Sequence, residues 1–332
     1  SNTTENTNGL CQFSLPDYTS SATIGNDCDG SPAVAQSPAA SSIVTGVGTL
    51  QTVTLTVLDA SGNNANCTFD VTLEDNSIPT ISCPSNTTED VNGSCQVSLP
   101  SYTTGATVSD NCDGSPSVTQ SPTPTTVISG IGTVQTITLT ATDANSNSAQ
   151  CTFTVTTQDN TNPSITCPVN QTESADSNCD LSLPNYTGSA TTDDNCDSSP
   201  TVTQSPTPTT VISGAGTTQT VTLTVTDASS NSASCTFDVT VEDNINPTIT
   251  CPSDVVVTAN GTICTANPPL GSPTVGDNCS VNSTLNDAPS SYTVGTATVT
   301  WTVTDGSTNT ATCAQLVTVN TNLPSQPATI TG

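Results

Sequence analysis

The spacing of the cysteines constrains this chain more than any other feature of its sequence. Cys11, Cys95 and Cys179 follow one another at intervals of 84 residues. The same interval relates three further series: Cys28, Cys112 and Cys196; Cys67, Cys151 and Cys235; and Cys83, Cys167 and Cys251. A fixed period of this length indicates an array of whole small domains, because solenoids of single supersecondary units repeat at roughly 20 to 50 residues.

The repeat divides the chain into four copies and a tail. Three near-copies cover residues 1–82, 83–166 and 167–250, and a fourth, divergent copy covers residues 251–320. Residues 321–332 are interpreted as a linker to a following domain. One step back from Cys83 places a cysteine two residues before Ser1, so we interpret the odd count of 15 cysteines as truncation of copy one and expect the chain to be a piece of a longer protein.

The composition excludes several classes of function. The chain has no lysine, arginine or histidine, and its 28 aspartates and glutamates give a formal net charge of −28. This charge repels phosphate backbones and anionic headgroups, which excludes nucleic acid and membrane-surface partners. Without His or Lys the chain lacks the usual activated nucleophiles. Thin β-domains also offer no deep cleft for a two-carboxylate glycosidase, so we predict that the protein is not an enzyme.

The cysteines also indicate a compartment. Fifteen cysteines without a Cys-x-x-Cys pair or a histidine favour disulfides over zinc or redox sites. Disulfides persist in oxidising surroundings. No apolar stretch approaches the roughly 20 residues of a membrane span, and no signal-peptide pattern is present. The sequence therefore predicts an extracellular protein without membrane insertion.

Each copy contains two alternating segments typical of a β-hairpin. In copy two, Thr136–Thr142 alternates threonine with apolar residues, a turn follows at residues 143–147, and a second alternating run begins at Cys151. One face of such strands is buried and the other is solvated. Roughly seven short strands in about 84 residues, without helical periodicity, predict an Ig-like β-sandwich. The predicted fold class is all-β: a tandem array of disulfide-stapled Ig-like sandwiches with almost no helix.

The few aromatic residues are assigned to the core and to one edge. Trp301 takes the position of Leu55 in the last copy, with neighbours that put it on the inward face. We therefore predict a core residue, not a ligand platform. Tyr18, Tyr102 and Tyr186 recur after Leu-Pro and are predicted to cover an edge of the sandwich.

Several ordered motifs resemble those of the hyalin repeat, or HYR domain, an Ig-like extracellular module. In the fourth copy they are the entry Pro247–Pro252 (PTITCP), Gly261–Cys264 (GTIC), Asp277–Cys279 (DNC), the turn Thr304–Asn309 and Cys313. Copy two carries the same motifs, and copy three carries the entry Cys167-Pro168, the loop Asp194–Cys196 and the turn Thr226–Asn231. Copy one has Asn26-Asp27-Cys28 and lacks its entry cysteine. The resemblance implies an adhesive or structural extracellular role, similar to tandem hyalin repeats in very long surface adhesins of gliding Bacteroidetes.

Four cysteines allow three pairings in each copy. In an Ig-like sandwich the first strand commonly runs parallel to the last, so we expect the entry cysteine to pair with the cysteine that opens the final strand. All pairs are expected within one copy: Cys11–Cys28, Cys83–Cys151, Cys95–Cys112, Cys167–Cys235, Cys179–Cys196, Cys251–Cys313 and Cys264–Cys279. Cys67 is expected to pair with the cysteine preceding Ser1.

Acidic residues are expected to gather where the copies meet, because each linker should reach the end of the next copy that carries its Asp-Asn-Cys loop and its Thr-Asp turn. The predicted groups are Asp75, Asp110, Asp113 and Asp143; Asp159, Asp194, Asp197 and Asp227; and Asp243, Asp277 and Asp305. Hard oxygen ligands from several loops suit Ca²⁺, as in cadherin linkers. The alternative is that these residues form turns and supply solubility.

The leading functional hypothesis is a non-catalytic structural and adhesive segment of a long cell-surface protein. It would form a rod or filament stalk that presents an adhesive region. Its expected partners are neighbouring domains of the same chain and lateral copies in a fibre. The alternative is a module that binds carbohydrate or protein through its repeat loops, which would favour exposed aromatic side chains.

Overall fold

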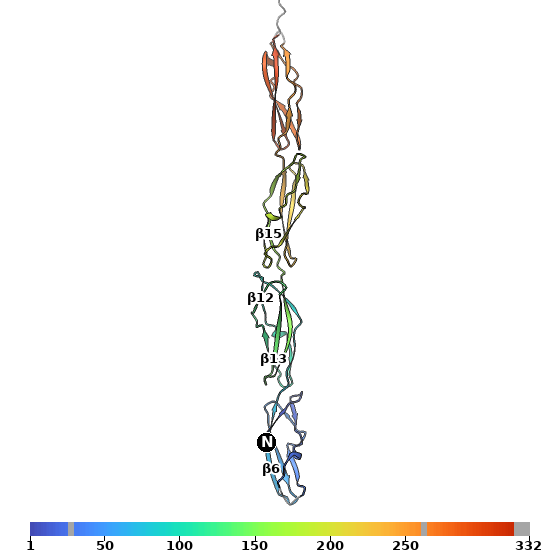
Figure 1. Ribbon diagram of the computed structural model, residues 1–332, viewed down its shortest axis with the longest axis vertical. Coiled ribbons are helices and arrows are strands. Elements are labelled where there is room, and N and C mark those ends of the chain that lie inside the picture. Colours follow the sequence, from blue (N-terminus) through green and yellow to red (C-terminus); the bar gives the residue numbers. More distant parts are fainter. Residues whose placement is uncertain (26–29, 260–263, 322–332) are drawn as a thin grey trace, which may run out of the picture. The chain divides into compact units, whose positions relative to one another are not determined.

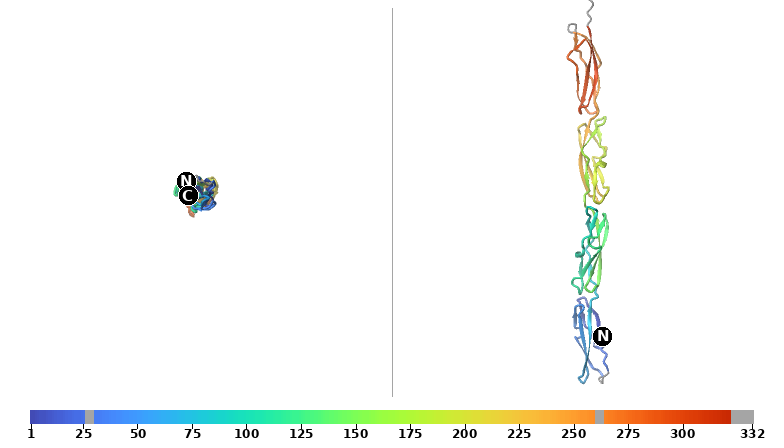
Figure 2. Two further views of the ribbon diagram at one scale, coloured as in Figure 1. Left: turned by 90° about the horizontal axis from the view of Figure 1, so that it is seen from below. Right: turned by 90° about the vertical axis from the view of Figure 1, so that its left-hand side faces the viewer.

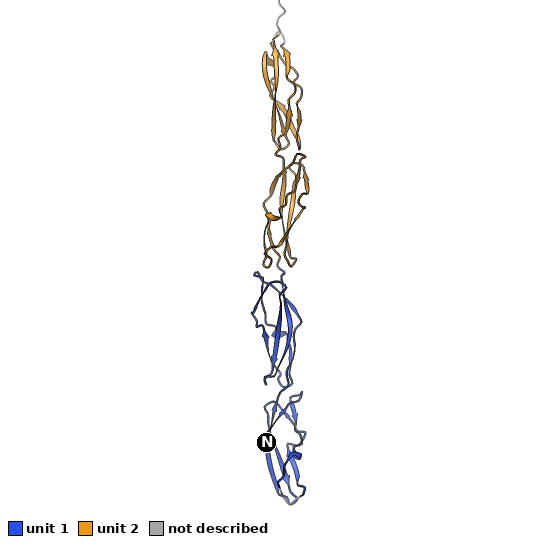
Figure 3. Ribbon diagram, viewed as in Figure 1, with its two compact units in different colours: residues 1–160 blue, residues 161–332 orange. Residues whose placement is uncertain are grey.

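The computed structural model describes residues 1–25, 30–259 and 264–321. It divides into two compact units, residues 1–160 and 161–332 (Figure 3). Each unit contains two β-sandwiches, which we call sandwich one (residues 1–74) and sandwich two (80–158) in the first unit, and sandwich three (164–242) and sandwich four (248–320) in the second. The predicted linker lies outside the described residues apart from Thr321.

One layer of every sandwich is a four-stranded sheet whose middle pair is the predicted hairpin. In order across the sheet, the strands are β1 (Thr3–Asn6), β6 (Asn64–Glu74), β5 (Leu50–Leu58) and β3 (Ala33–Ser37) in sandwich one; β8 (Thr87–Asp90), β14 (Ser148–Gln158), β13 (Val134–Thr142) and β11 (Ser117–Ser121) in sandwich two; β16 (Gln171–Ser174), β22 (Ser232–Glu242), β21 (Thr218–Thr226) and β19 (Thr201–Ser205) in sandwich three; and β24 (Val255–Thr258), β30 (Thr310–Asn320), β29 (Gly295–Asp305) and β27 (Val281–Asn286) in sandwich four.

The facing layer consists of short antiparallel pairs. They are β2 (Gln12–Ser14) with β4 (Ile43–Thr45); β7 (Thr80–Ser82) with β10 (Thr107–Ser109) and β9 (Gln96–Ser98) with β12 (Val127–Ser129); β15 (Ser164–Thr166) with β18 (Thr191–Asp193) and β17 (Asp180–Ser182) with β20 (Val211–Ser213); and β23 (Thr248–Thr250) with β26 (Thr274–Gly276) and β25 (Thr265–Ala266) with β28 (Tyr292–Thr293). The described part of sandwich one starts at β1, the counterpart of β8, β16 and β24.

The described residues contain little helix. Three short 3-10 helices, η1 (Thr19–Ser21), η2 (Thr103–Gly105) and η3 (Thr187–Ser189), follow the repeated tyrosines. None of the described helices has the length and hydropathy required to cross a bilayer. The prediction of an all-β array of Ig-like sandwiches is confirmed.

The register of the long strands places the chain's entry and exit at opposite ends of each sandwich. In sandwich two, β8 runs parallel to β14 and pairs Thr87 with Val155 and Asp90 with Gln158. The eleven residues of β14 span about 36 Å at roughly 3.3 Å per residue. The long strands follow the length of their own sandwich, as β6 and β13 illustrate in Figure 1, and the right-hand view of Figure 2 shows the same.

Alternation of threonine with apolar residues builds each core. On β13, Ile137, Leu139 and Ala141 are fully buried while the intervening threonines face outward. Trp301 is 7% exposed and its indole N–H donates to Gln315 Oε1 at 3.0 Å, which confirms it as a core residue. The repeated tyrosines pack edge-on against phenylalanines of the last strand, as Tyr102 does on Phe153 with ring centroids 5.2 Å apart.

Three of the expected disulfides are confirmed and four pairings are wrong. The first and last strands are joined by Cys83–Cys151, Cys167–Cys235 and Cys251–Cys313, each with Cα atoms 5.7 Å apart. The expected pairs Cys11–Cys28, Cys95–Cys112, Cys179–Cys196 and Cys264–Cys279 are wrong, because Cys11 bonds Cys112 and Cys179 bonds Cys279. Cys28 itself lies outside the described residues. Among the described cysteines, Cys67 and Cys264 are free and exposed.

The physical reason for this correction is the position of the two cysteines within one sandwich. The loop of Cys95 lies at the exit end, where Gly130 N–H donates to the Cys95 carbonyl and Gly132 N–H to the Thr157 carbonyl. Cys112 follows β10, which pairs with the entry strand β7. The two cysteines of one sandwich are therefore at opposite ends, whereas those of adjoining sandwiches within a unit meet.

Candidate functional site at the sandwich junctions

The junction within each unit is closed by a disulfide between adjoining sandwiches. Cys11 of sandwich one bonds Cys112 of sandwich two, with Cα atoms 4.9 Å apart. Cys179 of sandwich three bonds Cys279 of sandwich four, with Cα atoms 4.8 Å apart. The prediction that all pairs form within one copy is therefore wrong, and the cysteines couple neighbouring domains covalently.

The exit loop that carries the first of these cysteines is held by an Asx turn. Asn8 Oδ1 accepts from the backbone N–H groups of Leu10 and Gln12. Cys11 has φ 54°, a left-handed conformation that is uncommon for residues with a side chain. In sandwich three, Asp176 plays the part of Asn8, and the N–H groups of Asn178 and Asp180 hold the pKa of its carboxyl below the ordinary value.

The Asp-Asn-Cys loop meets the exit loop from the other side. Asp110 Oδ2 accepts from the Cys112 N–H at 3.1 Å, which orients the cysteine. The Asn111 amide donates across the junction to the Asn8 carbonyl, also at 3.1 Å. In the second unit, Asn278 donates in the same way to the Asp176 carbonyl at 3.1 Å. Each residue of the motif thus has a separate role at the junction.

Three carboxylates converge beside each of these disulfides. In the first unit, oxygen atoms of Asp75, Asp110 and Asp143 lie within 4.8 Å of one another. Asp75 comes from the linker, Asp110 from the Asp-Asn-Cys loop and Asp143 from the hairpin turn. Asp75 and Asp143 are 3% and 6% exposed. The predicted fourth member, Asp113, is outside this group, and its carboxylate accepts from the Ser115 N–H.

The hairpin turn is also hydrogen-bonded to the linker. Asp143 Oδ1 accepts from the N–H groups of Asn145 and Asn147, and its Oδ2 accepts from the Asn147 amide. The same amide donates to the Asp75 carbonyl at 2.9 Å. Asn147 therefore ties the linker to the turn, a role that its turn-forming composition alone does not reveal.

The second unit repeats this construction. Oxygen atoms of Asp243, Asp277 and Asp305 lie within 4.8 Å of one another. Asn309 donates to Asp305 Oδ2 at 2.8 Å and to the Asp243 carbonyl at 2.9 Å. Asp243 and Asp305 are 2% and 0% exposed. All three residues of this predicted group are thus brought together.

The remaining predicted group falls on both sides of the division between the units. Asp159 belongs to the first unit, and Asp194, Asp197 and Asp227 to the second. Within the second unit, Asp194 Oδ2 accepts from the Cys196 and Asp197 N–H groups, and Asp227 Oδ1 accepts from those of Ser229 and Asn231. The local loop geometry therefore matches that of the other two groups.

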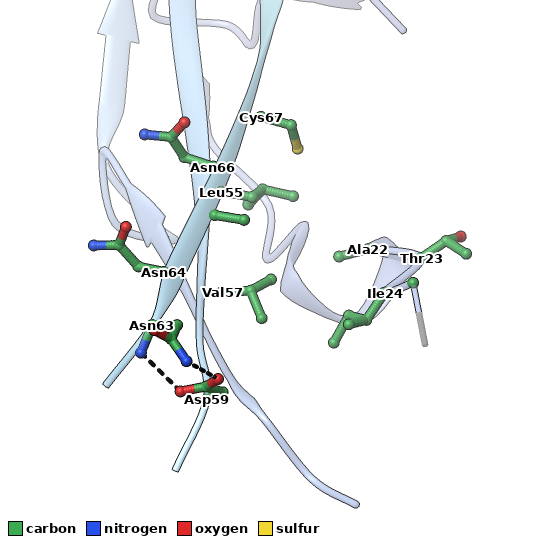
Figure 4. A pocket seen from close by; sticks show the side chains of 12 residues that line it. Ala22, Thr23, Ile24, Leu55, Val57, Asp59, Asn63, Asn64, Asn66 and Cys67 are labelled. Carbon is green, nitrogen blue, oxygen red and sulfur yellow. Dashed lines mark hydrogen bonds between the residues drawn. The ribbon is translucent and has the colours of Figure 1, made fainter. Parts of the chain in front are cut away.

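Sandwich one carries a groove of about 490 Å³ where the other sandwiches have their opening strand. Leu55, Val57, Ile24 and the free thiol of Cys67 line it (Figure 4). Val57 is only half-buried, whereas its equivalents Ala141 and Val225 are fully buried. In sandwich two, the corresponding surface is covered by β7, whose following residue Cys83 bonds Cys151.

Comparison with known proteins identifies the repeat. The HYR domain profile matches residues 74–157, 158–241 and 242–319. No curated protein sequence matches the chain significantly.

Solved structures with similar folds include tandem extracellular domains. One is the protocadherin GammaB4 extracellular domain, at 16% identity and a TM-score of 0.35, covering 96% of this chain and 65% of that chain. Another is Sidekick-1 immunoglobulin domains 1–5, at 11% identity and a TM-score of 0.30, covering 97% of this chain and 79% of that chain. A third is Drosophila N-cadherin EC1–4, at 10% identity and a TM-score of 0.29, covering 96% of this chain and 99% of that chain.

The motifs that pointed to the hyalin repeat now have structural roles: the entry and final cysteines staple each sandwich, and the Asp-Asn-Cys loop joins it to its neighbour. HYR repeats are adhesion-type extracellular modules, and they match most of the sequence. The chain belongs to the HYR domain family.

Proposed function

We propose that the chain is a non-catalytic stalk segment of a long cell-surface protein, which holds an adhesive region away from the cell. The observation that carries this proposal is the disulfide between adjoining sandwiches, seen as Cys11–Cys112 and Cys179–Cys279. An isolated binding module has no need of a covalent bond to its neighbour, whereas a stalk under tension does. The partners proposed are neighbouring domains of the same chain and lateral copies in a fibre.

The arrangement of the strands also suits a tension-bearing element. The chain enters and leaves each sandwich at opposite ends, so a pull on the ends acts along the strands. In sandwich two, that pull loads the parallel pair of β8 and β14 in shear and passes through Cys83–Cys151. The same arrangement recurs in sandwich three with Cys167–Cys235 and in sandwich four with Cys251–Cys313.

The alternative of a carbohydrate- or protein-binding module receives less support. Its best candidate for an exposed aromatic platform, Trp301, is buried and bonded to Gln315. Tyr186 is also buried, at 6% exposed.

Small-angle scattering of the intact oxidised chain tests the stalk. Four sandwiches of about 36 Å placed end to end give a rod about 145 Å long, with a radius of gyration of roughly 40 Å. A compact globule of 332 residues has a radius of gyration of about 20 Å. We expect a radius of gyration near that of the rod, and a radius near that of the globule would contradict the proposal.

A further inference from the structure

The acidic group of the second unit has an electrostatic feature that turn formation does not explain. Asp243, Asp277 and Asp305 place carboxylate oxygens within 4.8 Å of one another at a largely buried junction. The chain has no lysine, arginine or histidine. No side-chain cation of the protein is therefore available to offset three neighbouring negative charges.

Two oxygens of this group lack a hydrogen-bond donor. Asp243 is 2% exposed, and its Oδ1 accepts from the Ile245 N–H while its Oδ2 is buried without a protein partner. Asp277 Oδ2 accepts from the Cys279 and Ser280 N–H groups, whereas its Oδ1 is buried without a protein partner. Buried carboxylate oxygens are costly unless a donor or a metal ion meets them.

We propose that this junction is a calcium site, with Asp243, Asp277 and Asp305 as its carboxylate ligands. Ca²⁺ takes six to eight oxygen ligands in flexible geometry and accepts water for those that the protein does not supply. Zinc prefers nitrogen and sulfur ligands, and the nearest cysteine, Cys279, is committed to its disulfide. Mg²⁺ demands a tighter octahedral shell, which three carboxylates from separate loops do not impose.

The junction of the first unit has the same two features, converging carboxylates and a buried oxygen without a partner. Asp75, Asp110 and Asp143 converge in the same way, and Asp110 Oδ1 is buried without a protein partner. In both units the metal joins a linker aspartate to two loops of the following sandwich. The site thus goes beyond the stalk proposal: it fixes the linker to the domain that the disulfide already tethers.

Calorimetric titration of the intact oxidised chain, stripped of metal with a chelator, tests the site with calcium chloride alone and with magnesium chloride alone. We expect saturable calcium binding and weaker magnesium binding. Asp277→Asn should lower the number of calcium ions bound per chain by one, and Asp110→Asn should do the same at the other junction. The double variant should lose two.

Glu242→Gln is the matched control, because it removes the same charge at an exposed position beside Asp243 and should leave the stoichiometry unchanged. Circular dichroism of each variant in chelator should show the fold of the metal-free parent, so that lost binding is not lost folding. Absence of calcium binding at millimolar concentration, equal binding of magnesium, or equal effects of Glu242→Gln and Asp277→Asn would overturn the proposal. A long particle in scattering that binds no calcium would overturn the metal site and leave the stalk standing.

Discussion

Aspartates of the hairpin turns combine two properties that the sequence presents as alternatives. Asp143, Asp227 and Asp305 each accept backbone N–H groups two and four residues further on, so their turn-forming role is confirmed. These hydrogen bonds fix the orientation of the carboxylate. Its remaining oxygen lone pairs therefore also have a fixed direction. Turn chemistry and metal ligation are therefore compatible at one residue, and Asp110, Asp243 and Asp277 distinguish the two roles because each has an unpartnered oxygen.

Two of the repeated tyrosines give sandwiches two and three a polar contact at their edge. Tyr102 donates its hydroxyl to Glu89 Oε1 and Tyr186 to Glu173 Oε1, both at 2.9 Å. Burial is the first cause that raises the pKa of each phenol above its ordinary value, and the neighbouring glutamate is the second. Folding thus favours the protonated phenol.

Alkaline pH should destabilise the fold through these two phenols. Their folded-state pKa lies above the unfolded value of about 10, so their contribution is complete below pH 10 and is lost as the pH rises further. As the pH is raised, we expect phenolate absorbance to appear at a higher pH in the native chain than in the chain unfolded by denaturant. Tyr102→Phe with Tyr186→Phe should lower the free energy of unfolding at neutral pH by about 1 kcal/mol per site.

That double variant should also lose less stability between neutral pH and pH above 10 than the parent does. Chemical denaturation at both pH values provides the comparison. Superimposable phenolate titrations of the native and denatured parent would contradict the assignment.

At the scale of elements, the sequence begins shortly before β1, the counterpart of β8, so sandwich one is described without the opening strand of the other sandwiches. The remaining strands form the same four-stranded sheet, and its core still buries Val53, Leu55, Val71 and Leu73. The consequence is local: a groove opens over β5 and β6, and Cys67 has no partner. An exposed strand-binding surface of this kind accepts extended peptides by pairing and side-chain insertion.

A peptide with the sequence of residues 77–84 should occupy this groove. Its second isoleucine, equivalent to Ile81, would cover Val57. If the peptide is supplied as its mixed disulfide with glutathione, the Cys67 thiolate attacks the peptide sulfur, releases glutathione and forms the bond that Cys83 makes with Cys151. We expect mass spectrometry under non-reducing conditions to show one peptide on Cys67, formed faster than with a scrambled peptide. The variant Cys67→Ser should abolish this difference between the two peptides. Equal rates for both peptides on Cys67 would contradict strand insertion.

At the scale of the whole molecule, the disulfides determine how far the chain can be extended. Each junction disulfide closes a loop of about 100 residues, with separations of 101 for Cys11–Cys112 and 100 for Cys179–Cys279. Once the sandwiches have unfolded, a force applied to the ends passes through these bonds, so the residues inside the loops add little to the extended length. This is a property of the connectivity and does not depend on how the sandwiches are oriented.

Single-molecule stretching of the oxidised and reduced chain should reveal this connectivity. The fully unfolded oxidised chain should be shorter than the reduced chain by at least roughly 700 Å, because the two loops hold about 200 residues and each residue spans up to about 3.5 Å. Cys11→Ser with Cys112→Ser should lengthen the oxidised chain by more than about 100 Å. Cys67→Ser is the control and should change nothing; equal oxidised and reduced lengths would contradict the connectivity.

The repeat, the fold class, the hairpins and the core positions could be predicted from the sequence, because they depend on local alternation and on an 84-residue period that the cysteines make visible. The sequence also placed the acidic residues of the junctions and paired Cys83 with Cys151 correctly. The pairing of Cys11 with Cys112 required the folded structure, because sequence separation does not reveal which end of a sandwich a loop occupies. For the same reason it took the fold to show that Asp113 lies outside its group, that Asn147 ties the linker to the turn, and that two oxygens of Asp243 and Asp277 meet no donor.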